Sequence, residues 1–88
     1  MTYRLVLSKH AHKQLKKMDK HVAYMLAKYM KKQLDGLSNP RAYGKALVGD
    51  KTGLWRYRIG DYRVICEIKD EQLVILALEI GHRKLIYK

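Results

Sequence analysis

Hydrophobic residues near the start of the chain shift from a two-residue spacing to a spacing of three or four. Residues 2–7, TYRLVL, place an apolar side chain at every second position, which predicts a short strand. Ser8 then suits the N-cap of a first helix that runs to about Met18. In this helix we expect apolar side chains to point inward and lysines outward: Ala11, Leu15 and Met18 against Lys13, Lys16 and Lys17.

A second, longer helix is predicted after Asp19, which ends the first helix and caps the next. Its apolar positions follow the spacing of an amphipathic helix and are Val22, Met25, Leu26, Tyr29, Met30 and Leu34. Gly36 supplies a left-handed residue after the last turn, and Pro40 prevents continuation. The outer face carries Lys28, Lys31 and Lys32, which form either a solvated surface or a surface that collects a polyanion.

The second half of the chain reads as a long loop followed by strands. Residues 37–53 hold the only proline and lack periodicity, and a loop of this length in a small domain is usually functional or has local structure. Three strands are predicted at 54–59, 62–69 and 72–80, joined by the two-residue connections typical of antiparallel hairpins. The expected fold is therefore a single α+β domain over residues 1–88. Its order is β-α-α-β-β-β, with two N-terminal helices on one face of a four-stranded, mainly antiparallel sheet.

The first predicted hairpin separates apolar from basic side chains. A turn at Gly60-Asp61 pairs Ile59 with Tyr62 and Arg58 with Arg63. Because side chains alternate along a strand, one face carries Trp55, Tyr57, Ile59, Tyr62, Val64 and Cys66. The opposite face carries Arg56, Arg58 and Arg63, with Glu67 further along.

This arrangement of arginines predicts an anion site. Like charges directly opposite in a sheet are destabilising, so the fold gains nothing from placing Arg58 across from Arg63. A phosphate over that face turns the repulsion into binding energy, because the planar guanidinium binds two oxygens at once. The alternative is a set of solvated arginines, with Glu67 offsetting one of them.

The charge of the whole chain favours the same interpretation. Lys and Arg number 19 against 8 acids, for a net charge of +11. Nucleic acid, an anionic membrane or an acidic protein are the partners of opposite sign, and nucleic acid fits best. No apolar run approaches the roughly 20 residues that span a bilayer, and the N-terminus lacks a signal-peptide core, so we expect a cytoplasmic protein without a membrane partner.

The remaining polar residues argue against a metal or a cofactor. Cys66 is the only cysteine, which excludes an internal disulfide and a cysteine-built zinc site, and it is expected to be buried and inert. No pair of carboxylates and no histidine cluster suggests a metal site. The C-terminal segment EIGHRKLIYK instead brings Gly81, His82, Arg83 and Tyr87 close to the arginine-bearing strands, which suggests a phosphodiester site.

These residues resemble the RelE/ParE toxin superfamily of bacterial toxin–antitoxin systems, and its RelE-like mRNA endoribonuclease branch in particular. The similarity covers nearly the whole chain and is most specific in RYRIGDYRVI and GHRKLIY. It implies the β-α-α-β-β-β fold and cleavage of mRNA in the ribosomal A site, which inhibits translation. It also implies a cognate RelB-like antitoxin, so that a toxin that is monomeric alone forms a hetero-oligomer with it.

The resemblance also assigns residues. The family's basic positions on the first hairpin strand fall on Arg56 and Arg58, where relatives carry lysine, and the arginine of its YR pair falls on Arg63. Its C-terminal arginine falls on Arg83 and its late tyrosine on Tyr87. Arginine is a poor proton acceptor, so the substitutions at 56 and 58 bear on mechanism.

The chemistry expected from these residues needs no metal. The RNA 2′-OH attacks the adjacent phosphate and gives a 2′,3′-cyclic phosphate and a free 5′-OH. Arg63 and Arg83 would stabilise the phosphorane, while Arg56 and Arg58 position the RNA. Tyr87 is the expected base or base-stacking residue and His82 a candidate acid.

Two alternatives remain at this point. One is a ParE-like gyrase inhibitor without ribonuclease chemistry, and the other is a plain RNA-binding module. In the favoured interpretation, the helix lysines grip ribosomal RNA while the hairpin face takes the message.

Overall fold

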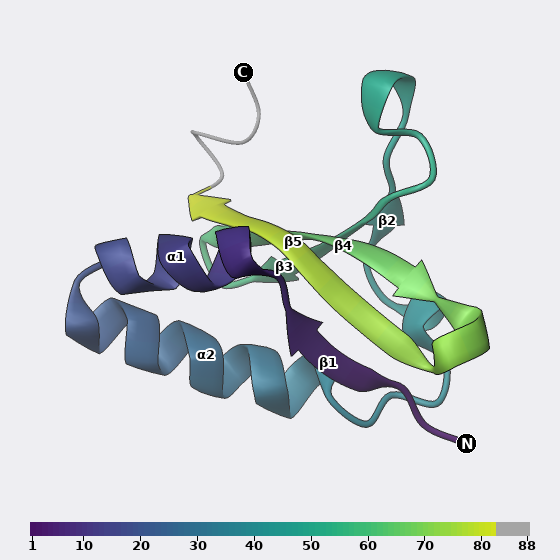
Figure 1. The fold of residues 1–88 in the computed structure, drawn as a ribbon, viewed down its shortest axis with the longest axis horizontal. Helices are drawn as coiled ribbons and strands as arrows, with labels where there is room; N and C mark the ends of the chain where they lie inside the picture. The colour runs from purple at the N-terminus through teal and green to yellow at the C-terminus, as the bar shows by residue number, and fades with distance from the viewer. Residues whose placement is uncertain (83–88) are drawn as a thin grey trace.

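Both helices lie on the same side of one mixed sheet (Figure 1). The computed structural model describes residues 1–82. The sheet has five strands in the order β1-β5-β4-β3-β2, and β1 alone runs parallel to its neighbour. The strands are β1 (Arg4–Leu7), β2 (Lys45–Ala46), β3 (Trp55–Ile59), β4 (Tyr62–Lys69) and β5 (Val74–His82). The predicted α+β class and helix placement are confirmed, whereas the predicted number of strands was one too few.

The two helices begin where their capping residues predict. Before α1 (Lys9–Lys17), the Ser8 hydroxyl accepts a hydrogen bond from the Ala11 amide at 3.0 Å. Before α2 (Lys20–Leu34), the Asp19 carboxylate accepts hydrogen bonds from the amides of His21 and Val22 at 3.0 and 3.2 Å. These caps satisfy amides that have no partner inside the first turn. Both predicted N-caps are therefore confirmed.

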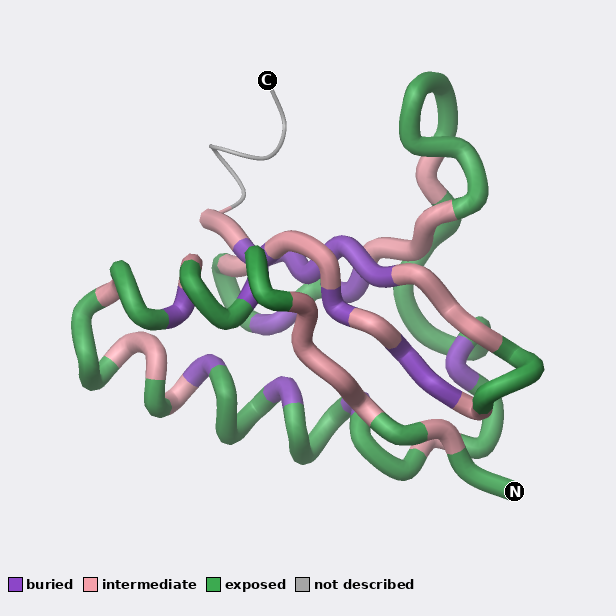
Figure 2. Tube along the Cα trace, in the orientation of Figure 1, coloured by how far each residue is buried: buried purple, intermediate pink, exposed green. Residues whose placement is uncertain are grey.

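The hydrophobic core lies between the helices and the sheet, as the buried stretches in Figure 2 show. The helices contribute Ala11, Leu15, Leu26, Met30 and Leu34, and the sheet contributes Tyr57, Ile59, Val64, Cys66, Ile75, Ala77 and Ile80. Tyr29 was expected inside but is 43% exposed. Leu26, Met30 and Leu34 are spaced four apart and occupy the stripe that faces the sheet, so Tyr29 lies to its side.

The predicted loop at 37–53 contains three short elements. They are η1 (Pro40–Ala42), β2 and η2 (Gly49–Lys51). Lys45 of β2 pairs with Arg56 and Ala46 with Trp55, so β2 extends the sheet beyond β3. A strand this short gives no periodic signal, which is why the pattern showed only a loop.

The final hairpin also differs from its prediction. The turn between β4 and β5 is a 3₁₀ segment, η3 (Asp70–Gln72), followed by Leu73 at φ +54°. The last strand therefore runs from Val74 to His82 and not from 72 to 80. It is also bulged, because Ile65 pairs with Glu79 whereas Cys66 pairs with Ala77. The first strand likewise begins at Arg4 and not at residue 2.

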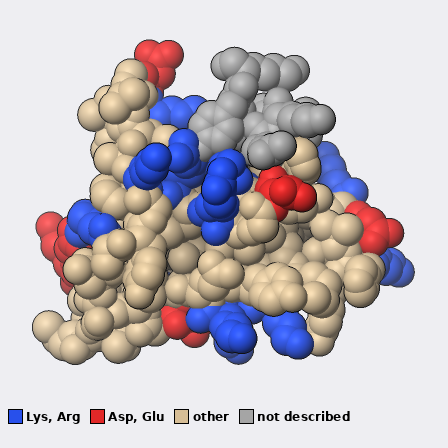
Figure 3. Space-filling view, turned by 180° about the vertical axis from the view of Figure 1, so that it is seen from behind, with Lys and Arg blue, Asp and Glu red and all other residues tan. Residues whose placement is uncertain are grey.

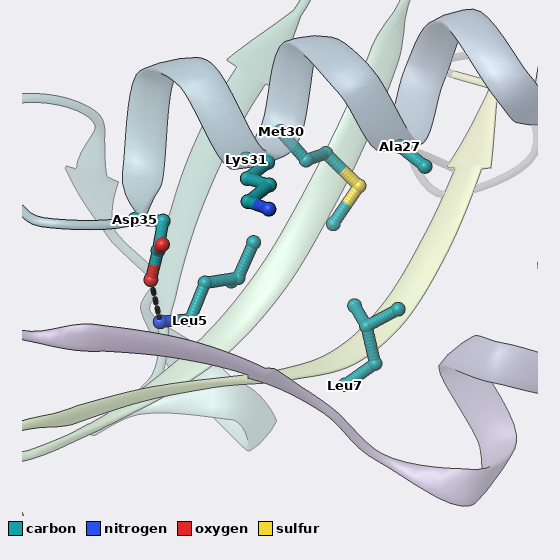
Figure 4. A pocket seen from close by; sticks show the side chains of 6 residues that line it. All are labelled: Leu5, Leu7, Ala27, Met30, Lys31 and Asp35. Carbon is teal, nitrogen blue, oxygen red and sulfur yellow. Dashed lines mark hydrogen bonds between the residues drawn. The ribbon is translucent and has the colours of Figure 1, made fainter.

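The outer edge of β1 is held by the residues that follow α2. The Leu5 amide donates to Asp35 Oδ1 at 2.9 Å (Figure 4). The Tyr3 amide donates to the Leu37 carbonyl, and the Gly36 amide to the Tyr3 carbonyl, each at 2.8 Å. These bonds occupy edge groups that could otherwise recruit another strand. No helix within residues 1–82 is long and apolar enough to cross a membrane.

Candidate nucleic-acid interface

The hairpin of β3 and β4 has the register that the sequence predicts. Gly60 adopts φ +61° in the two-residue turn, and Ile59 pairs with Tyr62. Arg58 then lies directly opposite Arg63, and Arg56 lies opposite Ile65. Cross-strand partners share a face, and the helices cover the face of Tyr57 and its neighbours in the core. Arg56, Arg58 and Arg63 therefore share the other side of the sheet, which we call the arginine face.

The three arginines differ in depth. Arg58 is exposed, Arg56 is half-buried, and Arg63 is only 6% exposed. Arg63 NH1 lies 3.4 Å from the Tyr62 carbonyl oxygen and donates to it. On β5, Arg63 pairs with Gly81, so the neighbouring strand has no side chain at this position. Arg63 is thus the most fixed cation of the arginine face, and Arg58 is the most accessible.

Cations and acids both lie next to the arginines on this face. Lys45 of β2 pairs with Arg56 and extends the row of cations toward the sheet edge, a contribution that the sequence did not reveal because β2 itself was missed. Glu67 is the acid that the sequence suggests could offset one arginine. In the structure its carboxylate forms an ion pair with the Lys69 ammonium at 3.5 Å. Glu79 forms an ion pair with Lys51 at 3.8 Å. Figure 3 shows basic side chains gathered in a group on the side turned away from the viewer in Figure 1.

The register separates His82 from the arginines. His82 pairs with Tyr62, and the two rings meet edge to face with centroids 5.5 Å apart. Tyr62 packs against the core on the helix side of the sheet. His82 therefore lies on the opposite side from Arg63, which argues against the predicted role of His82 as an acid beside the arginines. The other two predicted catalytic residues, Arg83 and Tyr87, lie outside the described residues.

The helix lysines form a second basic surface. All six predicted RNA-binding lysines are exposed: Lys13, Lys16, Lys17, Lys28, Lys31 and Lys32. The helices that carry them cover the side of the sheet away from the arginine face. Lys32 is the exception, because it lines a pocket at the edge of the sheet together with Arg58. The other five predicted lysines lie on the helix side of the sheet, away from the arginine face.

A network of polar contacts anchors the chain around η1. The Arg41 guanidinium binds both Asp70 carboxylate oxygens, at 2.9 and 3.0 Å, and the Tyr3 hydroxyl donates to Asp70 Oδ1 at 2.6 Å. The hydrogen bonds from Arg41 and then Tyr3 lower the pKa of Asp70 to about 2. Nearby, the Tyr57 hydroxyl donates to the Pro40 carbonyl at 2.6 Å. Burial raises the pKa of Tyr57, so this phenol stays protonated and keeps its donor.

A separate hollow lies between α2 and β1 (Figure 4). It has a volume of about 230 Å³ and is lined by Leu5, Leu7, Ala27, Met30, Lys31 and Asp35. Most of its wall is aliphatic, and Asp35 already accepts the Leu5 amide. No group of three His, Cys, Asp or Glu side chains within residues 1–82 could hold a metal ion.

Comparison with known proteins identifies the family. Residues 5–87 match the family model described as the ParE toxin of type II toxin–antitoxin systems, parDE. The chain belongs to this family. No curated protein matches the sequence. The match spans the helices, the sheet and the arginine face, so the chain is a toxin of a type II toxin–antitoxin system in the RelE/ParE superfamily.

Solved structures of RelE toxins share the fold. A chain of the Mycobacterium tuberculosis RelBE2 toxin–antitoxin complex superposes with a TM-score of 0.82 at 24% identity, covering 94% of this chain and 93% of that one. The isolated Escherichia coli RelE toxin gives 0.66 at 23%, covering 92% and 84%. The archaeal RelE–RelB complex from Pyrococcus horikoshii gives 0.59 at 28%, covering 94% and 97%. The predicted RelE-like architecture is confirmed.

Proposed function

We propose that this toxin is a metal-independent endoribonuclease that cleaves mRNA, with the scissile phosphate held on the arginine face. The observation that carries the proposal is the pairing of Arg58 directly across from Arg63 on neighbouring strands. Like charges in this position are destabilising, by a few tenths of a kcal/mol or more. A bound phosphodiester offsets that cost, because each guanidinium can donate two hydrogen bonds to phosphate oxygens.

The attacking group belongs to the RNA. Its 2′-OH displaces the 5′ oxygen of the next nucleotide at the shared phosphate, giving a 2′,3′-cyclic phosphate and a 5′-OH. Negative charge accumulates on the phosphorane oxygens in the transition state. Arg63, held in place by the sheet, stabilises that charge, while Arg56 and Arg58 orient the strand. The resemblance adds Arg83 as a second stabilising group.

Proton transfer falls to a residue outside the arginine trio. A guanidinium keeps its proton at neutral pH, so none of the three serves as a base. Tyr87 is the candidate base that the family resemblance supplies. It could instead stack on a base of the message. His82 is no longer favoured as the acid, since its strand position faces the helices.

Two basic surfaces suit a substrate presented by the ribosome. The arginine face takes the message in the A site, and the exposed lysines of α1 and α2 contact ribosomal RNA on the other side. Phosphate contacts position RNA without reading its sequence, so the choice of codon must come from other groups. Cleavage of free RNA is then expected to be slower than cleavage during translation.

The proposed partner that silences the toxin is an acidic, RelB-like antitoxin encoded beside it. Several structurally similar RelE chains were solved with RelB antitoxins. The net charge of +11 makes an acidic partner complementary to the whole surface. Such a partner should copurify with the toxin when the two genes are expressed together.

A gyrase-inhibiting function is the second candidate, because the matching family model takes its name from ParE. The two functions can be distinguished by whether protein synthesis or DNA synthesis stops first after the toxin is induced in cells. Pulse labelling with methionine and thymidine should show that protein synthesis falls before DNA synthesis. If thymidine incorporation falls first while labelled methionine is still incorporated, the ribonuclease proposal is wrong. A non-catalytic RNA-binding module would produce no cut message, whichever of the two syntheses is followed.

A further inference from the structure

A pocket of about 560 Å³ opens at the outer edge of β3. Because β2 pairs only with Trp55 and Arg56, no strand within residues 1–82 neighbours the outer edge from Tyr57 to Ile59. The end of α2 and the chain before β2 form the other walls. We call this hollow the β3-edge pocket. Its volume lies within the roughly 300–1,000 Å³ of ordinary ligand sites.

The walls of the β3-edge pocket combine an apolar floor with cations. Leu34, Leu37 and Tyr57 supply apolar surface, and Lys32 and Arg58 supply positive charge. No Asp or Glu is among the described residues that line it. A ligand that fits such walls has a flat apolar part next to a negative charge. A nucleotide of single-stranded RNA has both, in its base and its phosphate.

Tyr43 also lines the pocket, and its backbone is anchored. The residue as a whole is 61% exposed. The Trp55 indole donates to the Tyr43 carbonyl at 2.6 Å. The next residue, Gly44, approaches β3 so closely that a Cβ there would clash with the Arg56 carbonyl oxygen. An exposed aromatic ring on an anchored backbone can stack on a base with little loss of conformational entropy.

Arg58 connects this pocket to the proposed cleavage site. It lines the β3-edge pocket and also pairs with Arg63 on the arginine face. We propose that the pocket binds one unstacked base of the RNA next to the scissile phosphate, with Tyr43 stacking on the base and Lys32 and Arg58 holding the flanking phosphates. The inference rests on the proposed function and adds a base-binding subsite to it.

The test measures binding without cleavage. A single-stranded DNA oligonucleotide has no 2′-OH and cannot react, so its fluorescence anisotropy reports affinity alone. A second oligonucleotide of equal length carries abasic sugars and keeps every phosphate. Tyr43→Ala should weaken binding of the first by roughly 5- to 100-fold, since stacking on an aromatic side chain contributes that much per base. Binding of the abasic strand should be unchanged.

Matched variants separate stacking from other effects. Tyr43→Phe keeps the ring and should bind like wild type. Tyr24→Ala removes a tyrosine that is 66% exposed on α2 and should also bind like wild type. Lys32→Ala should weaken binding of both oligonucleotides. It should also reduce the salt dependence of the affinity by an amount that corresponds to about one phosphate contact.

Equal affinity of wild type and Tyr43→Ala for the base-containing strand would overturn the inference. If Tyr43→Ala then also bound the antitoxin more weakly, the pocket would be assigned to a protein partner. This result does not bear on the nuclease proposal, which is tested by the appearance of cut ends. Conversely, suppose that Tyr43→Ala weakens binding as expected in a toxin that cuts no message. That result would support the base-binding pocket and contradict the nuclease proposal.

Discussion

Arg58 and Arg63 could be paired from the sequence because two short-range rules agree. The Gly60-Asp61 turn sets the register, and the two-residue period of a strand sets the face. His82 could not be placed in the same way. Gly81 suggested that the strand had ended, whereas β5 continues to His82. One further strand position is enough to move a side chain to the opposite side of the sheet.

Replacing Arg63 by lysine tests the guanidinium itself. Arg63→Lys keeps the charge but loses the fork that binds two phosphate oxygens, so the single-turnover cleavage rate should fall by about 10²-fold. Arg58→Ala, at an exposed position, should reduce cleavage with little change in stability. Arg4→Ala is the matched control, because Arg4 is exposed and pairs with Val74 at the far end of β5. Equal rates for Arg63→Lys and Arg4→Ala would contradict the role given to Arg63.

Cys66 is expected to be chemically inert in the folded protein. It is fully buried, and desolvation raises the pKa of its thiol to about 12. The reactive thiolate is therefore scarce and inaccessible at neutral pH. A disulfide reagent such as DTNB should label the native protein only as fast as it unfolds and should label it at once in denaturant. Rapid labelling of the native protein would show that the core around β4 opens.

The short elements between α2 and β3 could not be predicted from the periodicity of the sequence. Ser8 and Asp19 cap helices through neighbouring amides, so local sequence predicts them. Strand β2 and η1 are instead held by distant partners, such as Arg41 on Asp70 and Trp55 on Tyr43. A pattern read along the chain does not report contacts of this kind. The β3-edge pocket depends on these contacts and was therefore not predicted.

Gly44 should be far less replaceable than Gly49, although both have positive φ, at +75° and +71°. Alanine at either position adopts a strained conformation that costs about 1–2 kcal/mol. At Gly44 the added Cβ also meets the Arg56 carbonyl, whereas at Gly49 it meets no atom of residues 1–82 within 4 Å. We expect Gly44→Ala to cost about 1–3 kcal/mol more than Gly49→Ala in urea unfolding. Equal losses would mean that residues 43 and 44 are not anchored to β3.

The Asp70 network should make stability depend on pH in the acid range. The folded-state pKa is about 2, below its ordinary value of 3.8, so ionised Asp70 stabilises the fold above about pH 4. That contribution is lost as the pH falls toward 2. Asp70→Asn should therefore lower the Tm at pH 7, and its difference from wild type should shrink between pH 4 and 2. A difference that stays constant over this range would show that the ion pair with Arg41 contributes nothing.

The molecule as a whole carries its charge on two sides of one sheet. Composition alone predicts a polyanionic partner, but it does not say that the core separates the arginines from the helix lysines other than Lys32. That separation follows from the fold, because α1 and α2 cover one face of the sheet (Figure 1) and the strand register puts the three arginines on the other. A toxin that contacts message on one side and ribosomal RNA on the other would use both surfaces together.

Mapping the 5′ ends of mRNA in a translating extract tests the ribonuclease most directly. Wild-type toxin should create new 5′-hydroxyl ends at in-frame codon positions, and Arg63→Lys should cut the same positions far more slowly. Arg4→Ala should cut like wild type. A wild-type toxin that leaves every message uncut in an extract that it otherwise inhibits would contradict cleavage by the arginine face.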